Sequence, residues 1–146
     1  MSDIPTYRLA VKGIITDGGG RVLVLKRSGK SREFPGKWDL PGGKINAGEK
    51  IDIALMREIR EETCLDVVPG TVIGKSESGT RLHRIIHLFV TIKEWHGDIN
   101  LSREHDEYRW LDIDSILTLD MVDHFLSVLQ SYKSCIRNPE TYNKPC

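Results

Sequence analysis

The chain has 146 residues, of which 39% are hydrophobic and 29% charged, proportions typical of one globular domain with a single hydrophobic core. We expect this domain to span residues 1–136, followed by a polar tail at residues 137–146 that contains two prolines and two asparagines. The 21 basic and 21 acidic residues give a formal net charge of zero, which argues against binding duplex nucleic acid through bulk electrostatic attraction.

Three features of the sequence indicate the compartment. The N-terminal stretch lacks a basic region followed by an apolar core, so it predicts no secretory signal, and no run approaches the ~18 apolar residues of a membrane span. The three cysteines are odd in number and widely spaced, which is typical of reduced thiols. We therefore expect a cytoplasmic protein with no membrane contact.

The N-terminal part of the chain predicts a β-hairpin. Residues 8–16 are rich in β-branched and apolar side chains, residues 21–26 read Arg-Val-Leu-Val-Leu-Lys, and Asp17-Gly18-Gly19-Gly20 lies between them. The continuous apolar run from Val22 to Leu25 further predicts a strand that is buried on both faces. Arg27 should end that strand.

A polar loop, a short strand at Trp38–Leu40 and a turn at Pro41-Gly42-Gly43 are expected next. The glycines and Lys44 suggest a comparison with a phosphate-binding P-loop, which needs a glycine, four residues and then Gly-Lys-Ser/Thr. Ile45 stands where that motif has its hydroxyl residue, so the P-loop hypothesis fails.

The following segment predicts a helix that begins near Glu49 or Lys50 and ends around Thr63. Taken at 100° per residue, its apolar residues fall on one arc, which should face the core. These residues are Ile51, Leu55, Met56 and Ile59.

Three carboxylates of this helix, Glu58, Glu61 and Glu62, lie three and four residues apart, so their oxygens can converge on one point. Charged runs at helical spacing are commonly solvated surface, and Arg57 and Arg60 could neutralise this one. Glu58 and Glu62, however, fall at the margin of the apolar arc. A carboxylate drawn into a core needs a charged partner or a metal, because burial alone would neutralise it.

The spacing of this segment resembles the Nudix box of the Nudix hydrolase family. Gly43 is followed after five residues by Glu49, after seven more by Arg57-Glu58-Ile59-x-Glu61-Glu62, and one residue later by Cys64-Leu65. These 23 contiguous residues match all but one of the fixed positions. The departure is Cys64, because the family usually has glycine there, at the positive φ of a helix C-terminus. Cysteine adopts that φ at a cost of about 1 kcal/mol.

The resemblance implies an α/β fold, the Nudix fold, in which a mixed β-sheet is sandwiched between helices. Converging carboxylates without soft ligands specify a hard cation, Mg²⁺ with Mn²⁺ as the alternative, and such an ion keeps open positions for substrate phosphates. The implied metal ligands are the Gly43 carbonyl, Glu58, Glu61, Glu62 and Glu104.

Further roles follow from the same resemblance. Arg57, also a catalytic candidate, and Glu49 look like a pair that orients the carboxylate helix from behind. The candidates for substrate binding are Gly42, Gly43, Lys44 and Arg27. Of these, Arg27 is an equally good candidate for a plain surface arginine.

Two further strands are expected at residues 67–73 and 82–95. His83 and His87 share one face of the second, but a metal site there is disfavoured because no third nitrogen or sulfur ligand joins them. An acidic loop then leads into a strand that contains Trp110. In Nudix hydrolases one glutamate of such a loop completes the metal site or acts as base. Glu104 is our first choice and Glu107 the second.

The C-terminal part, residues 112–135, has helical spacing of its apolar residues and predicts a short helix followed by a longer one that packs on the sheet.

The resemblance implies hydrolysis of a nucleoside diphosphate linked to a group X. Residue patterns that mark enzymes for ADP-ribose, dinucleoside polyphosphates and NADH are absent. Elimination leaves a small MutT-like enzyme that converts a nucleoside triphosphate, including an oxidised deoxynucleotide, to the monophosphate and pyrophosphate. Hydrolysis of ADP-ribose, a nucleotide sugar or a dinucleoside polyphosphate stays an alternative, as does a non-catalytic nucleotide sensor.

A monomer and a homodimer are both compatible with the sequence. Base contacts are expected around Phe34, His87 and residues 120–124.

Overall fold

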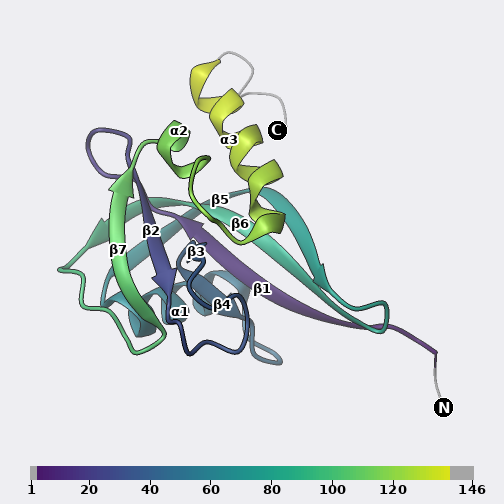
Figure 1. Ribbon diagram of the computed structural model, residues 1–146. Coiled ribbons are helices and arrows are strands. Elements are labelled where there is room, and N and C mark those ends of the chain that lie inside the picture. Colours follow the sequence, from purple (N-terminus) through teal and green to yellow (C-terminus); the bar gives the residue numbers. More distant parts are fainter. Residues whose placement is uncertain (1–2, 139–146) are drawn as a thin grey trace.

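The computed structural model describes residues 3–138, within which it contains seven strands, three α-helices and one short 3₁₀ helix (Figure 1). The strands are β1 (Thr6–Ile14), β2 (Val22–Arg27), β3 (Trp38–Asp39), β4 (Gly42–Lys44), β5 (Asp66–Gly79), β6 (His83–His96) and β7 (His105–Leu111). The helices are α1 (Ile51–Thr63), α2 (Ile113–Ile116), η1 (Asp123–Phe125) and α3 (Leu126–Arg137).

The strands form two sheets between layers of helix. One has the order β4-β1-β6-β5, with β1 parallel to β6 and the other pairs antiparallel, and the second has the antiparallel order β3-β2-β7. Helix α1 lies on one side of the strands, and α2 and α3 lie on the other (Figure 1). The predicted α/β class with mixed strands between helices is confirmed, although the strands divide into two sheets.

Two hydrophobic cores occupy the two sides of the strands, and β2 contributes to both. Val22 and Val24 join the core under α2, η1 and α3, whereas Leu23 and Leu25 join the core under α1. Successive side chains of a strand point to opposite faces, so four consecutive apolar residues serve two cores. The prediction that this strand is buried on both faces is confirmed.

The predicted hairpin forms only at its turn. Asp17 donates its backbone N–H to the Arg21 carbonyl at 2.9 Å, and Thr16 pairs with Val22 in an isolated antiparallel bridge. Beyond this point β1 pairs with β4 and β6, while β2 pairs with β3 and β7. The two strands diverge because they belong to different sheets. A local pattern of apolar residues does not indicate which sheet a strand joins.

Helix α1 begins at Ile51, with Lys50 as N-cap, and ends at Thr63 as predicted. Its buried residues are Ala54, Leu55, Ile59, Glu62 and Thr63. The expectation that the other two apolar residues of the arc face the core is wrong: Ile51 is 36% and Met56 is 41% exposed. The buried face is therefore rotated toward Ala54, and this rotation carries Glu62 into the interior.

The C-terminus of α1 has the predicted backbone conformation. Cys64 has φ of 65° and donates its backbone N–H to the Arg60 carbonyl at 2.9 Å. A side chain therefore occupies a left-handed position that favours glycine. Cys64 is an exposed free thiol.

Two segments differ from the expected elements. Gly42 and Gly43, expected in a turn, lie in strand β4 beside β1. Gly42 has φ of 139°, and a Cβ there would lie 2.0 Å from the Val11 carbonyl oxygen, so only glycine fits this position. Strand β5 continues to Gly79, six residues past its expected end at Ile73, and its polar extension pairs with β6.

The predicted tail begins inside the last helix. Arg137 is the final residue of α3, and residues 139–146 of the expected tail lie outside the described residues. Among residues 3–138 no helix has the length and apolar composition that crossing a membrane requires.

Candidate active site

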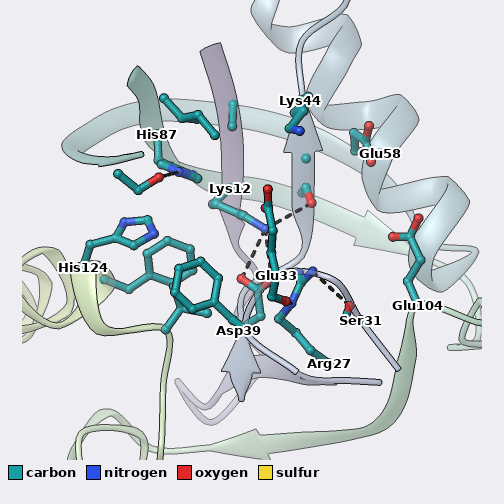
Figure 2. A pocket seen from close by; sticks show the side chains of 18 residues that line it. Lys12, Arg27, Ser31, Glu33, Asp39, Lys44, Glu58, His87, Glu104 and His124 are labelled. Atoms are coloured by element: carbon teal, nitrogen blue, oxygen red, sulfur yellow. Dashed lines mark hydrogen bonds and ion pairs between the residues drawn. The ribbon is translucent and has the colours of Figure 1, made fainter. Parts of the chain in front are cut away.

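A cavity of about 370 Å³ opens between the two sheets, α1 and η1, a volume within the usual range for a small-molecule site. Figure 2 shows Glu58 and Glu104 at one end, His87 and His124 at the other, and Lys12, Asp39 and Arg27 between them. We call the first end, with Gly43 and the nearby Glu62, the acidic end. We call the second, formed by Phe34, His87, His124 and Phe125, the aromatic end.

Two of the predicted ligands, Glu62 and Glu104, meet at the acidic end. Glu62 is only 2% exposed, and its Oε1 accepts a hydrogen bond from the Gly42 N–H at 3.2 Å. Its Oε2 is buried and has no hydrogen-bond partner among the described residues. Ligand atoms of Glu62, Glu104 and His105 all lie within 4.8 Å of one another. A buried, unpartnered carboxylate oxygen beside a second carboxylate fits a cation site.

The electrostatics of this end also favour a cation. Burial raises the pKa of Glu62 well above its ordinary value, and the negative charges of Asp39, Glu58 and Glu104 add to that effect against the Lys12 ammonium. Burial likewise raises the pKa of Glu58, opposed by Arg57. Carboxylates that are costly to ionise together become favourable ligands once a divalent ion shares their charge.

Gly43 makes room for one of these carboxylates. A Cβ added at Gly43 would lie 2.5 Å from Oε2 of Glu58. Any side chain at this position would therefore force the glutamate to move. The absence of a side chain thus lets Glu58 lie directly against β4.

The structure places two candidate glutamates away from this cluster. The Glu61 side chain is 59% exposed, its carboxylate contacts Arg57 at 3.3 Å, and it does not line the cavity. Glu107 forms an ion pair with Arg109 at 2.7 Å and does not line the cavity either. Glu104 does line it, which favours our first choice over the second.

Arg57 joins the helix to the strand beside the site. Its Nε and Nη2 bind the two carboxylate oxygens of Glu49 at 2.7 and 2.8 Å, a bidentate contact. Its Nη1 reaches Glu58 at 3.0 Å, and Nη2 also donates to the Lys44 carbonyl. The hydrogen bonds from Arg57 and from the Asn46 N–H lower the pKa of Glu49 to about 2. The predicted pairing of Arg57 with Glu49 is therefore present.

A buried ionic network forms the floor of the cavity, and the sequence interpretation missed two of its members. Lys12 is 6% and Asp39 2% exposed, and the Lys12 ammonium contacts Asp39 at 3.1 Å and the carbonyls of Leu40 and Gly42 at 3.2 Å. Arg27 donates to Asp39 at 2.8 Å. Although burial opposes it, Lys12 and Arg27 hold the pKa of Asp39 below its usual range. The cavity floor thus carries two cations and one anion.

Signals for these missed residues are present in the sequence. Lys12 is the only charged residue in the run from Leu9 to Thr16, and Asp39 stands between two apolar residues of the expected strand. A charge inside an apolar strand marks a buried pair or a site. His105 is also missed: burial lowers its pKa to about 4, and it lies 3.5 Å from Glu62.

Comparison with known proteins agrees with this geometry. A family model described as the NUDIX domain matches residues 6–131. The chain belongs to the Nudix family. The MutT protein from Methanosarcina mazei Go1 has a similar structure, with a TM-score of 0.83 and 32% identity, over 92% of this chain and 97% of that one.

Two curated Nudix relatives extend the comparison. The chain is 33% identical over 133 residues to a Danio rerio protein named 8-oxo-dGDP phosphatase NUDT18, a match that covers 88% of this chain but only 39% of the relative. It is 29% identical over 113 residues to nucleoside triphosphatase NudI of Escherichia coli O81 (strain ED1a), covering 70% of this chain and 80% of the relative. The chain thus spans less than half of the first relative.

These findings confirm the predicted Nudix fold and the MutT-like Nudix hydrolase family. They also confirm the predicted class of enzyme, a hydrolase of phosphoric anhydride bonds. The family generally uses a divalent metal, and the residues of the acidic end fit one.

Proposed function

We propose that this Nudix chain hydrolyses nucleoside triphosphates, including oxidised deoxynucleotides, to the nucleoside monophosphate and pyrophosphate. The observation that carries the proposal is the cavity itself, because it joins a carboxylate cluster at one end to aromatic rings at the other. A nucleotide has the matching polarity, with a polyphosphate at one end and a flat base at the other. The names of the two curated relatives support triphosphates and oxidised bases.

Glu58, Glu62, Glu104 and the Gly43 carbonyl would hold Mg²⁺ or Mn²⁺, and Glu61 stays a predicted ligand that lies outside the cluster. When bound, the ion neutralises charge on the phosphate oxygens. Mg²⁺ suits the proposal better than a soft metal because the proposed ligands, three carboxylates and a backbone carbonyl, all bind through hard oxygen atoms.

In the proposed reaction, a water oxygen bonds to one phosphorus of the anhydride, and the bridging oxygen leaves with the other phosphoryl group. The water gives its proton to a carboxylate. We assign this role to Glu104, because it lines the cavity and is exposed to an incoming water, whereas Glu62 is buried.

The cations of the site have separate proposed roles. Arg27 and Lys44 line the cavity and are placed to contact phosphate oxygens. Arg57 is a positioning residue, since it contacts Glu58 and Glu49 from outside the cavity. Gly42 is proposed to act through its backbone, because its N–H holds Glu62.

Turnover of a nucleotide panel tests the proposal. Deoxynucleoside triphosphates, 8-oxo-dGTP, ADP-ribose, diadenosine tetraphosphate and a nucleotide sugar are each incubated with Mg²⁺, with Mn²⁺ or with a chelator. We expect the triphosphates to give monophosphate and pyrophosphate only when metal is present. Faster hydrolysis of ADP-ribose, the sugar or the dinucleotide would support the alternative substrates. Tight binding without any turnover would support a nucleotide sensor.

A matched pair of variants tests the acidic end. Glu62→Gln keeps the acceptor for the Gly42 N–H but removes the charge, and we expect turnover to fall by about 10²–10⁴. Glu107→Gln is the control, and its turnover should stay within about twofold because Glu107 is paired with Arg109 away from the carboxylate cluster. Equal activity of Glu62→Gln and the wild type would place the metal elsewhere.

Cytoplasmic location and the choice between monomer and homodimer stay predictions.

A further inference from the structure

Two imidazole nitrogens at the aromatic end lack hydrogen bonds. His87 on β6 and His124 on η1 both line the cavity, and their ring centroids are 4.5 Å apart (Figure 2). Nδ1 of His87 and Nε2 of His124 are buried and have no partner among residues 3–138. Buried polar atoms in proteins are almost always paired, so these two nitrogens are available to bind a ligand that enters the cavity.

The opposite nitrogen of each ring contacts a serine. Ser78 Oγ lies 3.1 Å from Nε2 of His87, and Ser76 Oγ lies 2.8 Å from Nδ1 of His124. Both serines belong to the extension of β5, two residues apart and therefore on one face. Two serine–histidine pairs thus flank the aromatic end.

Both rings are uncharged near neutral pH. Burial, together with His124 and Lys12, lowers the pKa of His87 to about 4. Burial also lowers the pKa of His124, with Lys12 acting in the same direction and Asp39 and Asp123 against it. A neutral imidazole has one N–H donor and one acceptor nitrogen.

A serine hydroxyl can either donate or accept, and this freedom sets the polarity of the ring's other nitrogen. If Ser78 donates to Nε2 of His87, the proton lies on Nδ1, which then donates to a ligand. If Ser78 accepts from Nε2, Nδ1 becomes an acceptor. The same alternation applies to Ser76 and His124. Each pair can therefore offer a ligand either a donor or an acceptor.

We propose that the pairs Ser78–His87 and Ser76–His124 bind the polar edge of a purine base and accept either hydrogen-bond polarity at that edge. The proposal rests on the proposed function, because it assigns the base of the same nucleotide to the aromatic end. Phe34 and Phe125, which lie 6.0 and 4.5 Å from the His124 ring centroid, supply flat apolar walls beside the base.

The consequence is tolerance among purines. Adenine presents an amino donor where guanine presents a carbonyl acceptor. Oxidation of guanine to 8-oxoguanine likewise turns the acceptor N7 into an N–H donor. A site with fixed hydrogen-bonding groups rejects an analogue that leaves them unpaired by about 10⁴–10⁵. A site whose groups change polarity should instead hydrolyse all three purines at similar rates.

The first experiment uses the unmodified protein with Mg²⁺ and measures kcat/KM for dATP, dGTP and 8-oxo-dGTP. We expect the three values to agree within about tenfold. A larger difference between any two would overturn the proposal while leaving the proposed hydrolysis intact. Absence of all turnover would contradict the proposed function alone, and dissociation constants for dAMP and dGMP without metal would then decide between equal and selective purine binding.

The second experiment removes the nitrogens and keeps the rings. His87→Phe and His124→Phe should each lower kcat/KM about three- to tenfold for all three purines, mainly through a higher KM. The control is His83→Phe on the same strand, since His83 is exposed and does not line this cavity, and it should leave kcat/KM unchanged. Folding of each variant is checked from its melting temperature. Unchanged kinetics in both folded cavity variants would refute base binding by these residues.

Discussion

The two ends of the cavity are built from opposite chemistry. At the acidic end, Glu58 and Glu62 of α1 meet Glu104 from the loop before β7, and their negative charges raise one another's cost of ionisation. At the aromatic end, His87 and His124 are kept uncharged by burial and are held by neutral serine hydroxyls. Carboxylates are thus gathered at one end and neutral rings at the other.

This difference separates rate from selectivity. Interactions with charged groups in a partly buried site are strong and geometry-dependent, so a single change at the acidic end should affect turnover by orders of magnitude. Neutral hydrogen bonds contribute about 1 kcal/mol each, so changes at the aromatic end should alter substrate preference by small factors. The following predictions test that division.

The largest of these effects concerns the support of the acidic end. Arg57→Lys replaces a planar fork that binds both oxygens of Glu49 and also reaches Glu58 with a single ammonium that cannot make all three contacts. We expect turnover to fall about 10- to 100-fold, as steady-state kinetics would show. Because the fork orients Glu58, the apparent Mg²⁺ requirement should rise as well.

Arg60→Lys is the matched control for that change. Arg60 lies on the same helix, and its exposed guanidinium contacts Asp66 at 3.6 Å. Its replacement should leave turnover and Mg²⁺ requirement unchanged. If Arg57→Lys and Arg60→Lys behaved alike, the acidic end would not depend on the geometry that the fork imposes.

The acidic end was largely predictable because most of it is local in sequence. Glu58 and Glu62 are four residues apart on one helix, so spacing alone places them on the same face. Gly43 and Glu104 could be added only through the resemblance to a known family. The exposed position of Glu61 was not predictable, because it depends on where the buried face of α1 lies relative to the sheets.

The aromatic end depends on long-range pairing and could be located only roughly. Phe34, His87 and the segment containing His124 were expected near the base, but the serines were not. Ser76 and Ser78 lie in the part of β5 beyond its expected end at Ile73, where the polar residues lack the alternation of a half-buried strand. Their role appears only when β5, β6 and η1 are brought together in three dimensions.

A smaller effect, on stability, follows from the uncharged state of the aromatic end. The pKa of His87 is about 4 in the folded protein and about 6.5 in an unfolded chain, so between these values only the unfolded state binds the proton. Stability is therefore fully present above pH 6.5 and should fall as the pH decreases toward 4. Melting temperatures across this range would measure the loss.

Comparison of variants assigns that loss to the ring. His87→Phe removes the titrating group, so its melting temperature should fall less between pH 7 and pH 4 than that of the wild type. Part of the fall should persist, because burial also lowers the pKa of His105 and His124. An identical pH profile for His87→Phe and the wild type would mean that folding leaves the pKa of His87 unchanged.

The smallest predicted effect involves neither end, and it separates stability from activity. Cys64 holds φ of 65° at the C-terminus of α1, where glycine carries no Cβ penalty. Cys64→Gly should therefore stabilise the protein by about 0.5–1 kcal/mol, since relief of the strain exceeds the added freedom of the unfolded chain. Denaturant unfolding measures this gain.

Cys64→Ala is the control, because it removes the thiol but keeps the Cβ, and it should give no gain. Both variants should retain wild-type turnover and purine tolerance, because Cys64 does not line the cavity. A stabilised Cys64→Ala would trace the strain to the thiol and not to the backbone.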